Sequence, residues 1–309
     1  MMHIDQLVFG CGPLGSYAAD GGHDTGRDAL RTALTRGITR FDAAPSYGEG
    51  RAETLLGSAL TAVAPDAVAV TTKVGWLAMA NVNPYARPHG ADGARGGGRF
   101  DFTAAGVRAT LTASLGRLRR DSVDVVFLHD PECAPDLVSS EALPELRRQR
   151  DAGRLDALGV ATTDPDAALR LVERGEVVHV MIAAAWTLTR RHGRELLDRC
   201  AERDVAVLAA GPFASGLLAT ARPDPAAPWA YRQAPQDVVA LAGRLADSCE
   251  RHGVSLPQAA LQFPLRHPAV TGVVVGMRTA AEVDADLDLL APVPEQLWAE
   301  LDAHVGGQL

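Results

Sequence analysis

The stretch Phe41-Asp42-Ala43-Ala44-Pro45-Ser46-Tyr47-Gly48-Glu49-Gly50 joins a short apolar strand to an amphipathic helix. Residues 37–41 are typical of a buried strand, and the helix that follows the stretch carries a leucine-rich face. A proline and two glycines make the turn between the two elements. Asp42 and Tyr47 are therefore predicted at the C-terminal end of a strand, which is where barrels of alternating strands and helices carry their chemistry.

The same alternation of apolar strand and amphipathic helix repeats along the chain. Strands are predicted at residues 7–9, 37–41, 68–73, 123–128, 158–160, 177–182, 205–208 and 270–275. About eight such strand and helix pairs at short spacing indicate a (β/α)₈ TIM barrel of the α/β class. No stretch has the composition of a linker, so we expect one domain over residues 1–309.

Side chains that can cap a helix predict several helix starts. Asp24 or Thr25 is expected to cap the first helix, Thr103 the third, and Asp164 a later one that continues with a proline. The segment Thr279-Ala280-Ala281-Glu282 is a capping box at the head of the helix that follows the last strand.

Two long loops interrupt the alternation, after the third and the seventh strand. Residues 75–102 are rich in Gly, Pro, Asn and Arg, and residues 211–235 are rich in Pro and Ala. Long loops on the active rim of a compact domain are usually lids or binding loops, and a disordered surface insertion is the alternative. Extra C-terminal helices at 237–253 and 294–305 are expected to pack outside the ring.

Composition excludes several classes of function. The 309 residues are 47% hydrophobic with a formal net charge of -8, so a large core is possible and a nucleic-acid footprint is not expected. The chain has no long apolar run and no basic, apolar leader, so we expect no membrane partner and a cytoplasmic location. The four cysteines are far apart, which predicts free thiols and no metal. The oligomeric state is left open.

The glycines of Gly10-Cys11-Gly12-Pro13-Leu14-Gly15 resemble a phosphate-binding loop only superficially. Their spacing is not that of a dinucleotide fingerprint, and the residues after them do not run straight into a helix. A Rossmann domain is therefore not predicted.

Four side chains at the ends of three strands can do chemistry together: Asp42, Tyr47, Lys73 and His129. Each alone has a simpler explanation, since lysines at strand ends are usually solvated and an aspartate can merely cap a helix. On neighbouring strands of one barrel they form a site for proton transfer at a carbonyl carbon.

The roles of the four follow from their chemistry. A free phenol has a pKa of about 10, and a nearby ammonium group such as that of Lys73 favours the phenolate. We therefore expect Tyr47 to give and take the proton, Asp42 to hold Lys73 charged and oriented, and His129 to donate a hydrogen bond to the substrate oxygen.

The order of these residues resembles the aldo-keto reductase superfamily, whose members are NAD(P)-dependent oxidoreductases on a (β/α)₈ barrel. The resemblance rests on FDAAPSYGEGRAETLLGSAL, TTKVG and VVFLHDPE. The segments GRFDFTAAGVRATLTASLGRL, ALPELRRQRDAG and AAGPFASGLLA are similar to the branch that contains L-fucose dehydrogenase, D-threo-aldose 1-dehydrogenase and pyridoxal 4-dehydrogenase. The resemblance implies hydride transfer to or from a nicotinamide, with the four residues in the roles given above.

The resemblance also implies a set of cofactor contacts. Trp186 stands where the family usually has a tyrosine that stacks on the nicotinamide. Thr162 and Thr163 stand where the family has a polar pair that binds the carboxamide. Residues 211–217 match the segment that runs along the pyrophosphate. The full set of expected NAD or NADP contacts is Cys11, Gly12, Asp42, Thr162, Thr163, Trp186, Gly211, Pro212, Phe213, Ser215, Gly216, Leu217, Gly276, Met277, Arg278, Glu282 and Asp286. Independently of the family, a helix start beside Arg278 suits a phosphate.

Two departures from the family pattern leave the choice between NAD and NADP open. Asp286 stands where an asparagine commonly faces the adenine, and Glu282 stands near a position that is basic in strict NADPH users. A carboxylate near the ribose favours NAD, whereas Arg278 could bind a 2′-phosphate.

Three functions remain as hypotheses. The first is an NAD(P)-dependent oxidoreductase for a small polar carbonyl or sugar lactol, with Tyr47, Trp76 and His129 in contact with the substrate. The second is a lyase of aldolase type in which Lys73 forms a Schiff base. The third is a nucleotide-binding sensor or channel-associated subunit with little turnover, which the complete set of four residues disfavours.

Overall fold

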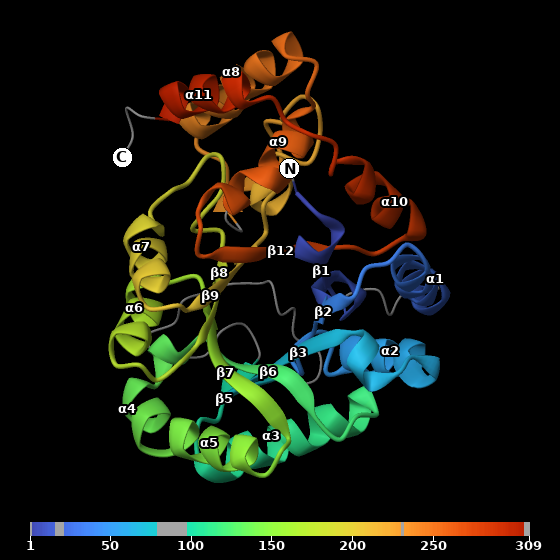
Figure 1. Ribbon diagram of the computed structural model, residues 1–309, viewed down its shortest axis with the longest axis vertical. Helices are drawn as coiled ribbons and strands as arrows, with labels where there is room; N and C mark the ends of the chain where they lie inside the picture. Colours follow the sequence, from blue (N-terminus) through green and yellow to red (C-terminus); the bar gives the residue numbers. More distant parts are fainter. Residues whose placement is uncertain (1, 16–21, 79–97, 230–231, 306–309) are drawn as a thin grey trace.

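The computed structural model describes residues 2–15, 22–78, 98–229 and 232–305. Within these residues, eight parallel strands form a closed barrel in the order β1-β12-β9-β8-β7-β6-β3-β2, with helices around it (Figure 1). The barrel strands are β1 Leu7–Gly10, β2 Arg40–Asp42, β3 Ala69–Val74, β6 Val123–His129, β7 Leu155–Thr162, β8 His179–Ala183, β9 Ala206–Ala210 and β12 Val270–Gly276. The predicted (β/α)₈ barrel is confirmed.

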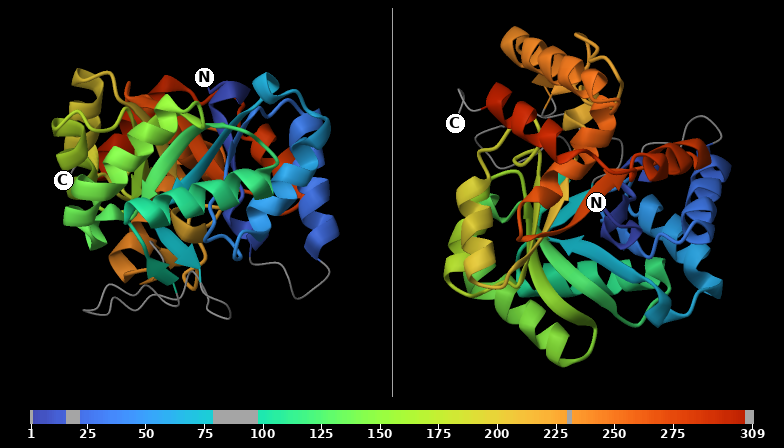
Figure 2. Two further views of the ribbon diagram at one scale, coloured as in Figure 1. Left: turned by 90° about the horizontal axis from the view of Figure 1, so that it is seen from below. Right: turned by 45° about the horizontal axis from the view of Figure 1, so that its top comes forward.

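The helices follow the strands in the order that the sequence predicts. Their bounds are α1 Gly22–Thr35, α2 Arg51–Ala59, α3 Ala104–Leu118, α4 Pro135–Leu137, α5 Leu143–Asp151, α6 Pro165–Glu173, α7 Arg194–Glu202, α8 Gln236–Arg251, α9 Leu256–Gln262, α10 Ala280–Asp288 and α11 Glu295–Val305. Helices α8 and α11 are the two predicted extra helices, and they lie side by side outside the ring (Figure 2, right).

Two apolar layers hold the barrel together. The larger core lies between the strands and the helices, where the outward side chains of the strands meet the apolar faces of the long surrounding helices. A smaller cluster fills the interior and includes Val125, Phe127, Met181 and Leu208. The strand sequences are nearly continuously apolar because parallel strands bury both of their faces.

Most of the predicted helix caps are confirmed, and one is wrong. Thr103 accepts a hydrogen bond from the Gly106 N–H at 3.1 Å, and Asp164 accepts from two N–H groups of the first turn of α6. Helix α1 begins at Gly22, so Asp24 and Thr25 lie inside the helix and do not cap it. A carboxylate in the first turn still stabilises the positive end of the helix dipole.

The two long loops contain short antiparallel pairs in the part that the structure describes. After β3, strand β4 Trp76–Ala78 pairs with β5 Gly98–Phe100; residues 79–97 of this loop lie outside the described ranges. After β9, β10 Pro228–Trp229 pairs with β11 Arg232–Gln233. The prediction that these loops are lids or binding loops stays a prediction.

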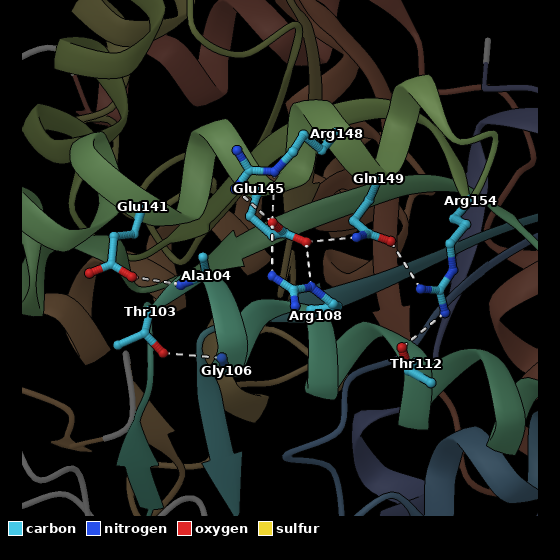
Figure 3. Close-up of polar contacts among 10 residues, drawn as sticks. All are labelled: Thr103, Ala104, Gly106, Arg108, Thr112, Glu141, Glu145, Arg148, Gln149 and Arg154. Carbon is cyan, nitrogen blue, oxygen red and sulfur yellow. Dashed lines mark hydrogen bonds and ion pairs between the residues drawn. The ribbon is translucent and has the colours of Figure 1, made fainter.

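A buried carboxylate joins α3 to α5, the helices that follow β3 and β6 (Figure 3). Glu145 is 1% exposed and accepts hydrogen bonds from Arg108 at 2.9 Å, Arg148 at 2.7 Å and Gln149 at 2.7 Å. The hydrogen bond from Arg108, helped by those from Arg148 and Gln149, lowers the pKa of Glu145 to about 2 although burial opposes this. The two helices are thereby fixed behind the strands that carry Lys73 and His129.

None of the helices in the described ranges has the length and apolar character needed to span a bilayer. Across the same ranges, no three His, Cys, Asp or Glu side chains gather in a way that could hold a metal ion.

Candidate active site

The four predicted catalytic residues meet at the carboxyl ends of adjacent strands. Asp42 ends β2, Lys73 lies next to the end of β3, and His129 ends β6. Because the barrel order places β2 beside β3 and β3 beside β6, the three strand ends are neighbours. Tyr47 enters the same space from the loop between β2 and α2.

Lys73 and Asp42 form a buried ion pair. The Lys73 Nζ lies 2.8 Å from Asp42 Oδ1 and 2.7 Å from Oδ2, and it also donates to the carbonyl oxygen of Ala43 at 2.9 Å. Thr71 Oγ1 donates to Asp42 Oδ1 at 2.7 Å. Lys73 is 1% exposed and Asp42 2% exposed, so each charge is compensated by its partner and not by water.

Tyr47 lies between this cation and the imidazole of His129. Its ring centroid is 4.8 Å from Lys73 Nζ and 6.4 Å from the centroid of His129, with the two rings edge-on at 85°. Trp76 packs edge-on against His129 at 5.2 Å and stacks on Phe100 at 6.2 Å. The β4–β5 pair therefore brings Trp76 to the cavity, and its contact with the substrate stays a prediction.

The helix that follows the Tyr47 loop, α2, is tied to β3 and α3 by the buried carboxylate of Glu53. Glu53, in the first turn of α2 and fully buried, accepts hydrogen bonds from Thr72 Oγ1 at 2.6 Å and Arg117 Nε at 2.7 Å. Gly48 has a φ of 61° and approaches Gly15 so closely that a Cβ on Gly48 would lie 2.2 Å from the Gly15 oxygen. These contacts leave the loop little freedom to move Tyr47 away from Lys73.

One cavity of about 800 Å³ runs from the four residues to the start of α10. Most of the predicted contacts line it: Gly12, Asp42, Tyr47, Lys73, Trp76, His129, Thr162, Thr163, Gly211, Pro212, Phe213, Ser215, Gly216, Gly276, Arg278, Glu282 and Asp286. Its size and its mixture of apolar wall and convergent polar groups are typical of a cofactor site.

Four predicted contacts do not line this cavity: Cys11, Trp186, Leu217 and Met277, all of which are buried in the core. For Cys11, burial raises the pKa of the thiol, with the nearby charge of Asp42 adding to the effect. The structure gives no support for cofactor contacts from these side chains.

Trp186 has a packing role in this structure. Its indole is 4% exposed, donates a hydrogen bond to the carbonyl oxygen of Pro264 at 3.2 Å and packs against Phe263 and His267. The part of the cavity wall contributed by β7, β8 and β9 is instead made of small or flexible side chains, namely Ala161, Thr162, Met181, Ala183 and Ala210.

Thr162 is held by its own neighbours at the end of β7. Its hydroxyl donates to Glu132 Oε2 at 3.0 Å and accepts from the Asp164 N–H at 3.0 Å. Since a hydroxyl has one proton, Thr162 can only accept a further hydrogen bond. It therefore fits the amino group of a carboxamide better than the carbonyl.

The start of α10 differs from the predicted capping box. Thr279 Oγ1 accepts from the Glu282 N–H at 3.0 Å as expected. The Glu282 carboxylate, however, accepts from the Arg278 N–H at 2.7 Å and from its guanidinium nitrogens at 3.1 and 2.7 Å. Glu282 therefore engages the one arginine that the sequence offered for a 2′-phosphate.

Sequence reasoning missed Asp130 as a residue of the cavity wall. It follows His129 directly, is 4% exposed, and its Oδ2 lies 3.7 Å from His129 Nε2. Its backbone adopts the left-handed conformation with φ 52° and ψ 56°, which turns the side chain into the cavity instead of continuing the strand. Its position, as a polar residue directly after a predicted strand, was the signal in the sequence that could have identified it.

Comparisons with known proteins show the family of this chain. The Aldo/keto reductase family matches residues 6–305. D-threo-aldose 1-dehydrogenase from a Pseudomonas species is 35% identical over 96% of this chain and 93% of its own length, and pyridoxal 4-dehydrogenase from Microbacterium luteolum is 29% identical over the same shares. The glycerol dehydrogenase of Gluconobacter oxydans shares the fold with a TM-score of 0.76 at 22% identity, over 98% of this chain and 92% of that one. The chain thus belongs to the aldo/keto reductase family, and it is an oxidoreductase.

Proposed function

We propose that this oxidoreductase removes a hydride and a proton from the anomeric carbon and hydroxyl of an aldose in its lactol form, giving a lactone, with NAD as the preferred cofactor. The observation that carries the proposal is the buried Lys73–Asp42 ion pair beside Tyr47 and His129. The name of the D-threo-aldose relative supports the substrate class.

Proton transfer and the binding of the substrate oxygen are assigned to different residues of this chain. The nicotinamide, when bound, accepts the hydride. Lys73 stabilises the phenolate of Tyr47, which takes the hydroxyl proton, while His129 holds the substrate oxygen. Asp130 adds a carboxylate beside His129 that can accept hydrogen bonds from further hydroxyl groups of a sugar.

The contacts of Lys73 argue against a Schiff-base lyase. All three ammonium protons have acceptors, two on Asp42 and one on Ala43. A buried lysine held charged in this way has no free electron pair for attack on a carbonyl carbon.

We expect reduction of NAD⁺ with free aldoses and none with their 1-O-methyl glycosides, measured by nicotinamide absorbance over a panel of both. The glycoside has no anomeric hydroxyl, so it offers no O–H proton for Tyr47 to take. Turnover of a glycoside at the rate of its parent sugar, or of simple aldehydes only, would contradict the proposed substrate class.

Glu282 is expected to set the preference for NAD⁺ over NADP⁺. A 2′-phosphate at Arg278 must displace the ion pair with Glu282 and then lies beside its carboxylate. We expect the wild type to favour NAD⁺ by at least about tenfold in kcat/KM, and Glu282→Gln to reduce the preference by about tenfold through tighter NADP⁺ binding. Adding Arg278→Gln to that variant should abolish the gain; an unchanged preference in Glu282→Gln would refute the role of this carboxylate.

A further inference from the structure

A carboxyl group without a partner lines the cavity at the end away from the four catalytic residues. Asp286 is 9% exposed, and the described residues give it no hydrogen bond and no ion pair. It lies one helical turn after Glu282 on α10, and Leu289 one turn further also lines the cavity. An unpaired carboxylate in such a place is costly, so a buried carboxyl of this kind favours its neutral form.

The charge nearest to Asp286, that of Glu282, also favours the neutral form of its carboxyl group. Glu282 faces the cavity from the same helix, and Arg278 is already bound to Glu282. On the other side α10 packs against α1. There Asp284 of α10 is paired at 3.2 Å with Arg36, which directly follows α1. Within α1, Arg27 pairs with Asp24 and Arg31 with Asp28. Helix α9, whose Gln262 donates to the Leu289 carbonyl oxygen, carries no charged residue. Burial, followed by the charge of Glu282, raises the pKa of Asp286 to about 7.

A neutral carboxylic acid has one O–H donor and one C=O acceptor. This is the pattern that a side-chain amide presents, and an amide pairs with the N6 amino group and a ring nitrogen of adenine. If the nicotinamide lies at the Tyr47 end of the cavity, the adenosine half of the cofactor lies at the α10 end, next to this carboxyl.

We propose that Asp286 binds the adenine of the cofactor as a neutral carboxylic acid, donating through its O–H and accepting through its C=O. The inference rests on the proposed cofactor and adds a regulation of its binding. Because the bound form needs the proton, the affinity is highest below the pKa of Asp286 and falls as the pH rises above it.

The test is calorimetric titration of the purified protein with ADP-ribose between about pH 5.5 and about pH 8.5. ADP-ribose lacks the nicotinamide, and its diphosphate has no proton to lose in this range, so titration of Tyr47 or His129 does not dominate the signal. We expect a constant Kd below about pH 7 and a rise that approaches tenfold per pH unit above it. At about pH 8, binding should take up close to one proton, measured by comparing buffers of different ionisation enthalpy.

Asp286→Asn keeps the donor and the acceptor without a titrating proton. Its Kd for ADP-ribose should not change with pH, and at the highest pH tested it should be about tenfold lower than that of the wild type. Binding to this variant should take up no proton. The matched control Asp284→Asn changes a carboxylate on the same helix that is paired with Arg36 and not in the cavity, so it should follow the wild type.

A wild-type affinity that rises with pH, or that is independent of pH, overturns the inference, as does proton uptake that persists in Asp286→Asn. The proton uptake of the wild type decides the matter even if that variant does not fold. Failure of the protein to bind either ADP-ribose or NAD⁺ at any pH would count against the proposed cofactor itself.

Discussion

Replacing Tyr47 by phenylalanine is expected to lower kcat by about 10²- to 10⁴-fold, the contribution of a positioned general acid or base. The change removes one oxygen and leaves the ring that packs between Lys73 and His129. It removes the acidic O–H group that the charge of Lys73, 4.8 Å from the ring centroid, acts on. The measurement is single-turnover reduction of NAD⁺ with a saturating aldose.

Binding separates this loss from a structural one. The Kd for NAD⁺ and the free energy of unfolding of Tyr47→Phe should stay close to those of the wild type, because the cavity wall and the Glu53 contacts that tie α2 to β3 and α3 are unchanged. A variant that retains full turnover would show that the proton leaves by another route, and His129 would then be the group to replace next.

The convergence of the four candidate residues could be predicted because strand ends are a topological property. Asp42, Lys73 and His129 each follow an apolar run, and any closed parallel barrel brings the ends of neighbouring strands to one rim. Their residue types then limited the chemistry. The distances that make Lys73 an ion-pair partner rather than a nucleophile required the folded chain.

Trp186, which the family resemblance places at the nicotinamide, lies in the core in this structure. It too follows a strand, β8, but the chain turns through Ala184 with a φ of 56° and the indole enters the core beside Phe263. A sequence pattern places a residue near the rim and does not fix which way a turn in the left-handed region aims the side chains after it. Asp130, whose φ is 52°, was missed for the same reason.

The effects of replacing Asp42 and Lys73 on kcat/KM should not be additive. Lys73→Met removes the cation that stabilises the phenolate, and Asp42→Asn removes the charge that orients it through two hydrogen bonds. Each single variant is expected to lose about 10²-fold or more in kcat/KM, and the double variant no more than the worse of the two. Independent contributions would instead multiply, and a double variant that loses the product of both factors would contradict the assignment of Asp42 as a support for Lys73.

The free energy of unfolding gives a second test of the same pair. Here the double variant should be more stable than the single variant Lys73→Met. In Lys73→Met the carboxylate of Asp42 stays 2% exposed with only Thr71 as a side-chain donor. Leaving one charge of a buried pair alone costs about 3–5 kcal/mol, so this variant should unfold at lower urea concentration than the wild type. Adding Asp42→Asn removes the unpaired charge and should recover part of that loss while activity stays low. Recovery of stability without recovery of turnover would separate what the ion pair does for the fold from what it does for Tyr47.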